Sequence, residues 1–378
     1  MTEQLQRSGS SVPFVDLRIV HEPLKDEILA GIAAVIDRGD FVNGAEVAEF
    51  ERAFAAYCRV RLCVGVASGL DALRIGLLAG GIEPGDEVIV PANTFVATLE
   101  AVTQARGVPV VVDVTEGDYN LDVAAAEAAI TARTRFVLPV HLYGQLADMA
   151  ALEEIAARHG VSIVEDAAQA HGASRDGRAA GGVGLASAFS FYPAKNLGAM
   201  GDAGALVTND DGVARAARAL REHGQEAKYD HRLEGYTARL DTIQALVLRA
   251  KLRLLDGWNE QRRAAAAYYA DGLDGVGDLT LPPVAPGSEP VWHVYPVRTR
   301  AREGLASFLS QRGVATSRHY PVPVHLSPAY AWLGRSPGSA PVAEALADEL
   351  LSLPIYPGIT DAQLDHVVTS TRDFFDRG

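Results

Sequence analysis

The sequence predicts an α/β fold, with a mostly parallel sheet covered by helices and a smaller α+β domain after it. Short β-branched runs alternate with longer segments of helical periodicity between residues 23 and 250, a pattern typical of such sheets. The 378 residues exceed what one hydrophobic core usually serves. Beyond residue 250, connections rich in proline and glycine join shorter elements. We therefore expect a large domain over residues 1–250 and a small one over 251–378.

The expected strands are short apolar runs of four or five residues, as buried parallel strands are. In chain order they span residues 87–90, 108–112, 136–140, 161–164 and 205–208. Segments of helical periodicity lie between them, at residues 69–79, 95–105, 149–158 and 211–222. A longer helix, from about residue 240 to 259, leads into the expected second domain.

Composition excludes several classes of protein. Hydrophobic residues make up 48% and charged residues 22% of the chain, as in ordinary globular proteins. The net charge of -14 opposes binding to nucleic acid or to anionic membranes. Cys58 and Cys63 match neither a disulfide framework nor a metal-ligand spacing, so we expect packing residues and no metal. Without a signal peptide or a membrane-length apolar run, we expect a cytoplasmic protein.

A lysine, Lys195, lies in a glycine-rich segment between two expected strands. The segment, residues 190–204, reads SFYPAKNLGAMGDAG. A lysine among apolar and small residues can be desolvated, which lowers its pKa and makes its amine a nucleophile for a Schiff base. A solvated loop lysine is the alternative.

Two carboxylates, Glu165 and Asp166, follow the apolar run 161–164. They fall at the carboxyl end of an expected strand, where open α/β sheets bind ligands. A carboxylate there could pair with a cation, or it could cap the next helix. Gln169 comes three residues later and could donate a hydrogen bond to the same ligand. For His171 we favour a buried structural role.

Two strand-to-helix turns complete the pattern. Ser68 and Gly69 open a helix directly after the apolar segment 62–66, and free amides at a helix N-terminus bind phosphate. Capping by Ser68 is the alternative. Phe95 follows the strand at 87–90 and could stack on an aromatic ring or belong to the core. With the lysine and the carboxylate, these turns supply what pyridoxal phosphate requires: a phosphate anchor, a stacking face, a partner for the ring nitrogen and a Schiff-base lysine.

In its motifs the chain resembles the DegT/StrS family of sugar aminotransferases over nearly its whole length. The resemblance rests on EFE at 49–51, GDEVIVP at 85–91, EDAAQ at 165–169, the lysine segment, HYP at 319–321 with His325, and LPIYP at 353–357. It implies a fold-type-I pyridoxal-phosphate architecture, a homodimer with shared active sites, and an amino-acid donor, glutamate by family habit.

The resemblance also implies roles for single residues. Lys195 would hold the cofactor and shuttle protons, Asp166 would contact the pyridine nitrogen, and Gln169 would contact the phenolic oxygen. The phosphate would lie at Ser190 and the amides of Gly69 and Leu70, with Phe95 against the ring. Where the family often supplies an asparagine from the partner subunit to the phosphate, this chain has Thr237, a shorter donor.

Details of the motifs point to the position that is aminated. Tyr192 before the lysine, GDAG at 201–204 and HLYGQ at 141–145 resemble the members that aminate C-3 of a dTDP-linked 3-keto-6-deoxyhexose. Tyr320 and His325 are candidate contacts to the hexose, although either could be structural. The candidate cations for the substrate diphosphate are Lys228, Arg239 and Arg262.

Several alternatives stay open. The substrate could be a sugar aminated at C-4 or a cyclic ketone such as an inosose. A lyase is disfavoured, because such relatives tend to carry histidine where this chain has Lys195. A non-catalytic ligand-binding or regulatory homologue would be expected to have lost one of the cofactor residues, and Lys195, Asp166, Gln169 and Ser190 are all present.

Overall fold

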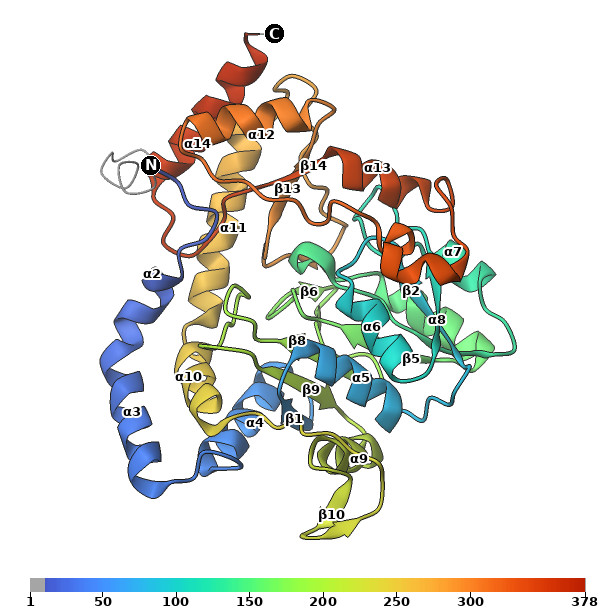
Figure 1. Ribbon diagram of the computed structural model, residues 1–378. Helices are drawn as coiled ribbons and strands as arrows, with labels where there is room; N and C mark the ends of the chain where they lie inside the picture. Colours follow the sequence, from blue (N-terminus) through green and yellow to red (C-terminus); the bar gives the residue numbers. More distant parts are fainter. Residues whose placement is uncertain (1–10, 378) are drawn as a thin grey trace.

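A seven-stranded sheet forms the centre of the computed structural model, which describes residues 11–377 (Figure 1). Its strands, in spatial order, are β1 (Leu62–Val66), β9 (Gly204–Thr208), β8 (Ala186–Ser190), β5 (Ser162–Asp166), β4 (Thr134–Val137), β2 (Glu87–Pro91) and β3 (Val108–Val112). Every pairing from β8 to β3 is parallel, and β9 runs antiparallel to both of its neighbours. The predicted α/β fold with a mostly parallel sheet is confirmed.

The helices beside the sheet begin at polar caps in the sequence. Ser68, Asp148 and Asp210 each accept a hydrogen bond from a first-turn amide of the helix that follows. These helices are α5 (Gly69–Ala79), α8 (Met149–His159) and α9 (Asp211–Arg221), and α6 (Ala97–Gln104) lies beside α5. The ends of all four helices lie within two residues of the predicted bounds.

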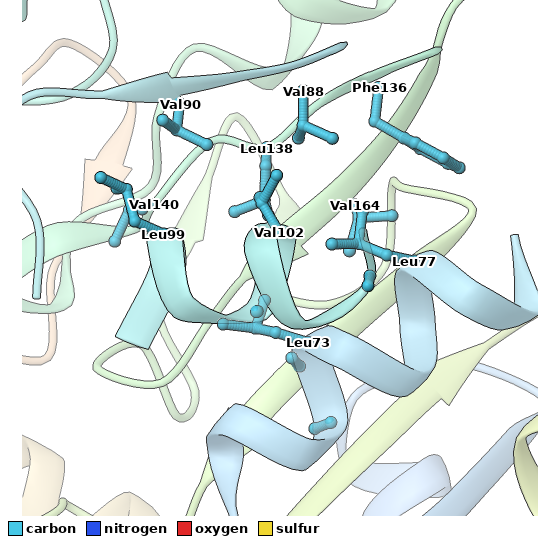
Figure 2. Packing of buried hydrophobic residues seen from close by; sticks show 14 of the residues in the cluster. Leu73, Leu77, Val88, Val90, Leu99, Val102, Phe136, Leu138, Val140 and Val164 are labelled. Carbon is cyan, nitrogen blue, oxygen red and sulfur yellow. The ribbon is translucent and has the colours of Figure 1, made fainter. Parts of the chain in front are cut away.

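The main core lies between the sheet and the helices α5 and α6. Figure 2 shows Leu73 and Leu77 of α5 beside Leu99 and Val102 of α6, opposite the side chains of several strands. Residues of the strands, and of the segment that follows β4, are fully buried or nearly so: Val88, Val90, Phe136, Leu138, Val140 and Val164. This packing fixes the first turn of α5 against the carboxyl ends of the strands. Cys58 and Cys63 are buried free thiols.

The predicted single helix over 240–259 is wrong, because the chain forms two helices there. α10 (Thr242–Leu252) ends in a tight turn in which the amide of Leu254 donates to the carbonyl of Lys251 at 2.9 Å, and α11 (Leu255–Leu273) follows. No proline or glycine occurs between residues 250 and 256. The break therefore has no local breaker in the sequence, and both helices contribute residues to the same two core clusters.

The strand predicted over 136–140 ends early. β4 stops at Val137, and beyond it Val140 forms a single parallel bridge to Asp166 at the end of β5. The amide of His141 donates to the carbonyl of Asp166 at 2.9 Å. This pairing places residues 141–145 directly beside the carboxyl end of β5.

The C-terminal part of the chain has its own core cluster. There β13 (Tyr295–Arg298) pairs antiparallel with β14 (Leu350–Leu353), beside α12 (Arg302–Gln311) and α14 (Asp361–Phe375). Val12, near the other end of the chain, packs into this cluster and bridges Val314. The domain boundary near residue 250 stays a prediction.

The remaining elements surround these two parts. α3 (Lys25–Arg38) and α4 (Ala45–Tyr57) pack on α10 at one side of the molecule (Figure 1). The hairpin of β10 (Gln225–Ala227) and β11 (Asp230–His231) projects from the body beyond α9 (Figure 1). Within residues 11–377, no helix has the length and apolar character needed to span a bilayer.

Candidate active site

One cavity of about 520 Å³ lies where the carboxyl end of β5, the first turn of α5 and the lysine segment meet. Its size falls in the range of small-molecule sites. Apart from the two candidate arginines for the diphosphate, twelve residues were predicted for the site. Nine of them line the cavity: Gly69, Leu70, Phe95, Asp166, Gln169, Ser190, Tyr192, Lys195 and Tyr320. The fold therefore gathers residues that are up to 251 positions apart in the chain, from Gly69 to Tyr320.

Lys195 lies in a tight loop between β8 and β9. Its amide donates to the carbonyl of Tyr192 at 2.8 Å, and an added Cβ at Gly198 would come within 2.2 Å of the Pro193 carbonyl oxygen. Only glycine therefore closes this loop. Burial lowers the pKa of the Lys195 amine to about 8, although nearby Asp166 acts in the opposite direction.

Asp166 and Glu165 point to opposite sides of β5 because side chains alternate along a strand. Asp166 faces the cavity, where it accepts from the Thr98 hydroxyl at 2.9 Å and the Ala168 amide at 3.1 Å. Burial raises its pKa, and these two hydrogen bonds only partly oppose that effect. A cationic N–H in the cavity would stabilise the carboxylate.

Glu165 is fully buried and points away from the cavity. Burial alone would raise its pKa, but hydrogen bonds from His141, Ser187 and backbone amides lower it overall. The His141 Nε2 atom lies 2.8 Å from one carboxylate oxygen, and the Ser187 hydroxyl lies 2.7 Å from the other. Its hydrogen-bonding capacity is used inside the protein, which leaves Asp166 as the carboxylate available to a ligand.

Gln169 bridges two walls of the cavity. Its Oε1 accepts from the amide of Tyr143 at 2.7 Å, and its Nε2 donates to the hydroxyl of Tyr320 at 3.0 Å. An amide nitrogen carries two hydrogens, so one N–H of Gln169 remains for a ligand.

The first turn of α5 approaches Ser190 closely. An added Cβ at Gly69 would come within 2.6 Å of the Ser190 Cβ. The amide of Ala72 makes the first intrahelical bond, to the Ser68 carbonyl at 3.0 Å, and the Asp71 amide donates to the Ser68 hydroxyl. The amides of Gly69 and Leu70 precede these bonds and remain available to an anion.

Aromatic residues form the outer wall of the cavity. The Phe95 ring is 53% exposed and lies 5.4 Å from the Tyr320 ring, measured between centroids. Tyr192 is similarly exposed at the cavity wall. An aromatic ligand that covered these faces would remove exposed apolar area from water.

Three predicted residues do not line the cavity. Thr237 lies beside His223, with its hydroxyl 3.3 Å from the ring Nε2, and Lys228 lies on the projecting β10–β11 hairpin. His325 is buried, and its Nε2 lies 3.0 Å from a carboxylate oxygen of Glu344. The ligand contacts predicted for Thr237, Lys228 and His325 stay predictions.

Two of the predicted diphosphate partners are already engaged within the chain. The Arg239 guanidinium pairs with Glu222 at 2.7 Å. Arg262 borders the cavity but is buried, and its Nη1 donates to the carbonyls of Trp292, His293 and Ile355. Binding of a diphosphate at either arginine also stays a prediction.

The structure adds residues that line the cavity, or that orient a lining residue, which the sequence did not single out. Thr98 orients Asp166, Tyr143 orients Gln169, and His293 and His319 line the wall opposite the helix. Tyr143 and His319 lie inside motifs that were recognised, but a motif does not say which of its side chains reach the ligand. Nothing in the sequence marks Thr98 or His293, because their positions depend on how separate elements pack.

Comparison with known proteins now identifies the family. The model of the DegT/DnrJ/EryC1/StrS aminotransferase family matches residues 23–372. The chain belongs to this family. Its enzymes depend on pyridoxal phosphate, and a similar solved structure, of ntda from Bacillus subtilis at 32% identity, contains the amine form of that cofactor. The protein is accordingly a pyridoxal-phosphate-dependent aminotransferase.

Similar proteins share almost the whole length of the chain. A dTDP-3-amino-3,4,6-trideoxy-alpha-D-glucose transaminase from Streptomyces venezuelae is 50% identical over 97% of each chain. The erythromycin biosynthesis sensory transduction protein EryC1 from Saccharopolyspora erythraea is 49% identical, over 96% of this chain and 99% of its own. The crystal structure of S. venezuelae DesV in complex with a ketimine intermediate matches with a TM-score of 0.95 at 50% identity, over 97% and 99% of the chains.

The cavity fits pyridoxal phosphate. The Gly69–Ser190 cradle has no room for a further side chain and offers free amides to a phosphate. Burial raises the pKa of the Asp166 carboxyl, and a protonated pyridine nitrogen beside it would stabilise its charged form. Lys195 faces the same cavity with an amine of lowered pKa. Within residues 11–377, no cluster of metal-ligating side chains competes with this reading.

Proposed function

We propose that this enzyme transfers the amino group of an amino acid, L-glutamate, to C-3 of a dTDP-linked 3-keto-6-deoxyhexose. One observation carries the proposal: Lys195, with its lowered pKa, and Asp166 share one cavity in a chain half identical to a dTDP-3-amino-3,4,6-trideoxyglucose transaminase. The motifs around Tyr192 and Tyr143 support the assignment to C-3. The product belongs to deoxyaminosugar biosynthesis.

Each cofactor contact in the proposal uses a group that faces the cavity. Ser190 and the amides of Gly69 and Leu70 hold the phosphate. Phe95 covers one face of the ring, and Gln169 donates to its phenolic oxygen. Asp166 keeps the ring nitrogen protonated.

The chemistry is divided between cofactor and protein. Pyridoxal phosphate supplies an electron sink for the substrate carbanion. Lys195 would hold the cofactor through its amine, and its free amine would move the proton at the substrate carbon. A pKa near 8 leaves a useful fraction of this amine neutral near pH 7 to 8. Burial of the amine excludes water from the transferred proton.

The substrate end of the site involves the outer loops and a second subunit. We propose that Tyr192, Tyr320 and His325 contact the hexose. We also propose a homodimer in which Lys228 contacts the substrate diphosphate, and Thr237 the cofactor phosphate, in the partner's active site. Support comes from apolar residues exposed on α3, on the following loop and on the hairpin: Leu29, Ile36, Phe41, Tyr229 and Leu233. A cytoplasmic location accords with a nucleotide-sugar substrate.

An absorption experiment tests the site. Purified protein loaded with pyridoxal phosphate should show the band of the lysine-bound cofactor, and L-glutamate should convert it to the band of the amine form. Borohydride reduction followed by peptide mapping should place the cofactor on Lys195. No bound cofactor, or an adduct on another lysine, would contradict the assignment.

Experiments can distinguish the proposed function from two kinds of alternative: a different substrate or position of amination, and a protein that does not catalyse the reaction. NMR of the product separates amination at C-3 from amination at C-4 and from reaction with a cyclic ketone such as an inosose. The name of the relative EryC1 refers to sensory transduction, which keeps a regulatory, non-catalytic homologue as a second candidate. Such a protein would bind the cofactor without converting a keto sugar, so a single-turnover assay with the amine form decides between them.

A further inference from the structure

Tyr143 connects the cofactor side of the cavity to the loop on its other wall. Its backbone amide donates to Oε1 of Gln169 at 2.7 Å, and its hydroxyl donates to the carbonyl of His319 at 2.5 Å. Asn93 Nδ2 donates to the same hydroxyl at 3.3 Å. Tyr143 is buried and does not line the cavity itself.

The direction of these hydrogen bonds follows from the backbone groups, because each of them can only donate or only accept. The amide of Tyr143 can only donate, so Gln169 must present its oxygen to Tyr143 and its NH2 group to Tyr320. The hydroxyl oxygen of Tyr320 therefore accepts from Gln169, at 3.0 Å. The Tyr320 proton is left for another acceptor. Burial raises the pKa of Tyr320, so the phenol keeps this proton.

The backbone at Tyr143 is held in an uncommon conformation. Its φ of 60° lies in the left-handed region, and Gly144 follows with a φ of 92°. A Cβ at Gly144 would come within 2.9 Å of a Val291 methyl group and 3.0 Å of the Trp292 amide nitrogen. Left-handed tyrosines are rare and persist where the surroundings determine them. Here the turn directs the Tyr143 amide to Gln169.

We propose that Tyr143 is a positioning residue that fixes Gln169 and the His319–Tyr320 loop relative to each other, so that Tyr320 donates its hydroxyl proton to an uncharged oxygen of the sugar substrate. The identity of that substrate rests on the proposed function. A directed donor favours a sugar with an acceptor oxygen at this position over one without it, because the phenol would otherwise lose its partner. Tyr143 thereby contributes to sugar recognition without touching the sugar.

The test compares Tyr143→Phe with a matched control. Tyr119→Phe removes the hydroxyl of a second buried tyrosine, whose ring packs edge-on against Tyr143 at 6.3 Å but which bonds neither Gln169 nor the loop. The two half-reactions are followed separately in the loaded enzyme, with L-glutamate and with the dTDP-linked keto sugar. Hydrogen exchange of residues 317–326 reports on the loop without any substrate.

We expect Tyr143→Phe to lower kcat/KM with the sugar by about tenfold and to leave the glutamate half-reaction within about twofold of wild type. Amides in residues 317–326 should exchange faster in this variant. Tyr119→Phe should match wild type in all three measurements. Equal losses in both half-reactions, or unchanged exchange in residues 317–326, would overturn the proposal.

Tyr320→Phe provides a second route if Tyr143→Phe does not fold. It should impair only the sugar half-reaction, and combining the two substitutions should cost no more than Tyr320→Phe alone. A loss in the glutamate half-reaction would contradict the proposed donor. If the wild-type protein accepts an amino group but never passes it to a keto sugar, the proposed function fails, and the exchange measurement still decides whether Tyr143 holds the loop.

Discussion

At the residue scale, two neighbouring carboxylates have opposite environments. Glu165 is saturated with hydrogen bonds inside the protein, and its pKa is lowered despite its burial. Asp166 faces the cavity with a raised pKa. Strand alternation predicts that the two point apart, but which one faces the ligand depends on which side of the sheet the cavity occupies.

Replacing Asp166 tests its role at the pyridine nitrogen. Asp166→Asn keeps the shape of the side chain and removes the negative charge, so the ring nitrogen loses a charge-assisted partner. We expect kcat to fall by about 10- to 100-fold while cofactor is still bound. Thr98→Val removes one hydrogen bond to the same carboxylate and should have a smaller effect. A wild-type rate for Asp166→Asn would refute the assignment.

Lys195 is the residue whose replacement should be most damaging. Lys195→Ala or Lys195→Arg removes the amine that attaches cofactor and moves the proton, so we expect turnover to drop by at least about 10²- to 10⁴-fold. Single-turnover rates with L-glutamate measure this directly. Folding is checked by thermal unfolding, because Lys195→Ala leaves the buried Asp166 carboxylate without its neighbouring amine.

The lowered pKa of Lys195 gives a pH prediction with a definite sign. Below its pKa the amine is protonated and cannot attack the cofactor aldehyde. The rate of cofactor loading onto ligand-free protein should therefore rise with pH and level off above about pH 8. An ordinary lysine, with a pKa of 10.5, would give a rate that still increases at pH 9 to 10. Stopped-flow absorbance distinguishes the two profiles.

At the element scale, the first turn of α5 combines a cap with an anion site. Ser68 caps the helix through its hydroxyl and leaves the amides of Gly69 and Leu70 free. The sequence left two alternatives for this turn: capping of the helix by Ser68, or phosphate binding by the free amides. The geometry accommodates both, because the cap uses the amide of Asp71.

A glycine substitution tests this cradle. Gly69→Ala places a methyl group 2.6 Å from the Ser190 Cβ, so helix and strand must move apart. We expect at least about tenfold weaker binding of pyridoxal phosphate, measured by equilibrium titration. Gly257→Ala, in the first turn of α11 with nothing within 4 Å of the new Cβ, is the matched control. It should leave binding unchanged and should not destabilise the fold.

At the scale of the whole molecule, the predicted contacts of Lys228 and Thr237 require a second chain. Both lie outside the cavity of their own chain, at or near the projecting hairpin. If the hairpin serves the partner's cavity, a variant defective in Lys195 and one defective in Lys228 should complement each other. A mixed dimer then contains one site with both residues intact.

Mixing Lys195→Ala with Lys228→Ala tests this arrangement. After the subunits have been exchanged by dilution and reconcentration, activity at low sugar concentration should exceed the sum of the separate variants. Size-exclusion chromatography with light scattering should give about twice the mass of one chain. A monomer, or activity that is only additive, would show that each chain works alone.

The sequence by itself determined much of this protein. Alternating β-branched and helical segments gave the parallel sheet and the bounds of four helices within two residues, because periodicity reflects burial directly. The lysine loop, the carboxylates at the end of β5 and the Ser-Gly turn of α5 were found because parallel strands bring their carboxyl ends to one edge. Local chemistry and sheet geometry pointed to Gly69, Phe95, Asp166, Gln169 and Lys195, and the family resemblance added the other four cavity residues: Leu70, Ser190, Tyr192 and Tyr320.

Only the tertiary structure decided the rest. The break between α10 and α11 has no local breaker in the sequence, and both helices contribute residues to the same two core clusters. The contacts that orient the site, from Thr98 to Asp166 and from Tyr143 to Gln169 and the His319 loop, join residues 26 to 176 positions apart. Such contacts leave no periodicity or spacing in the chain, because they arise when separately specified elements pack against one another.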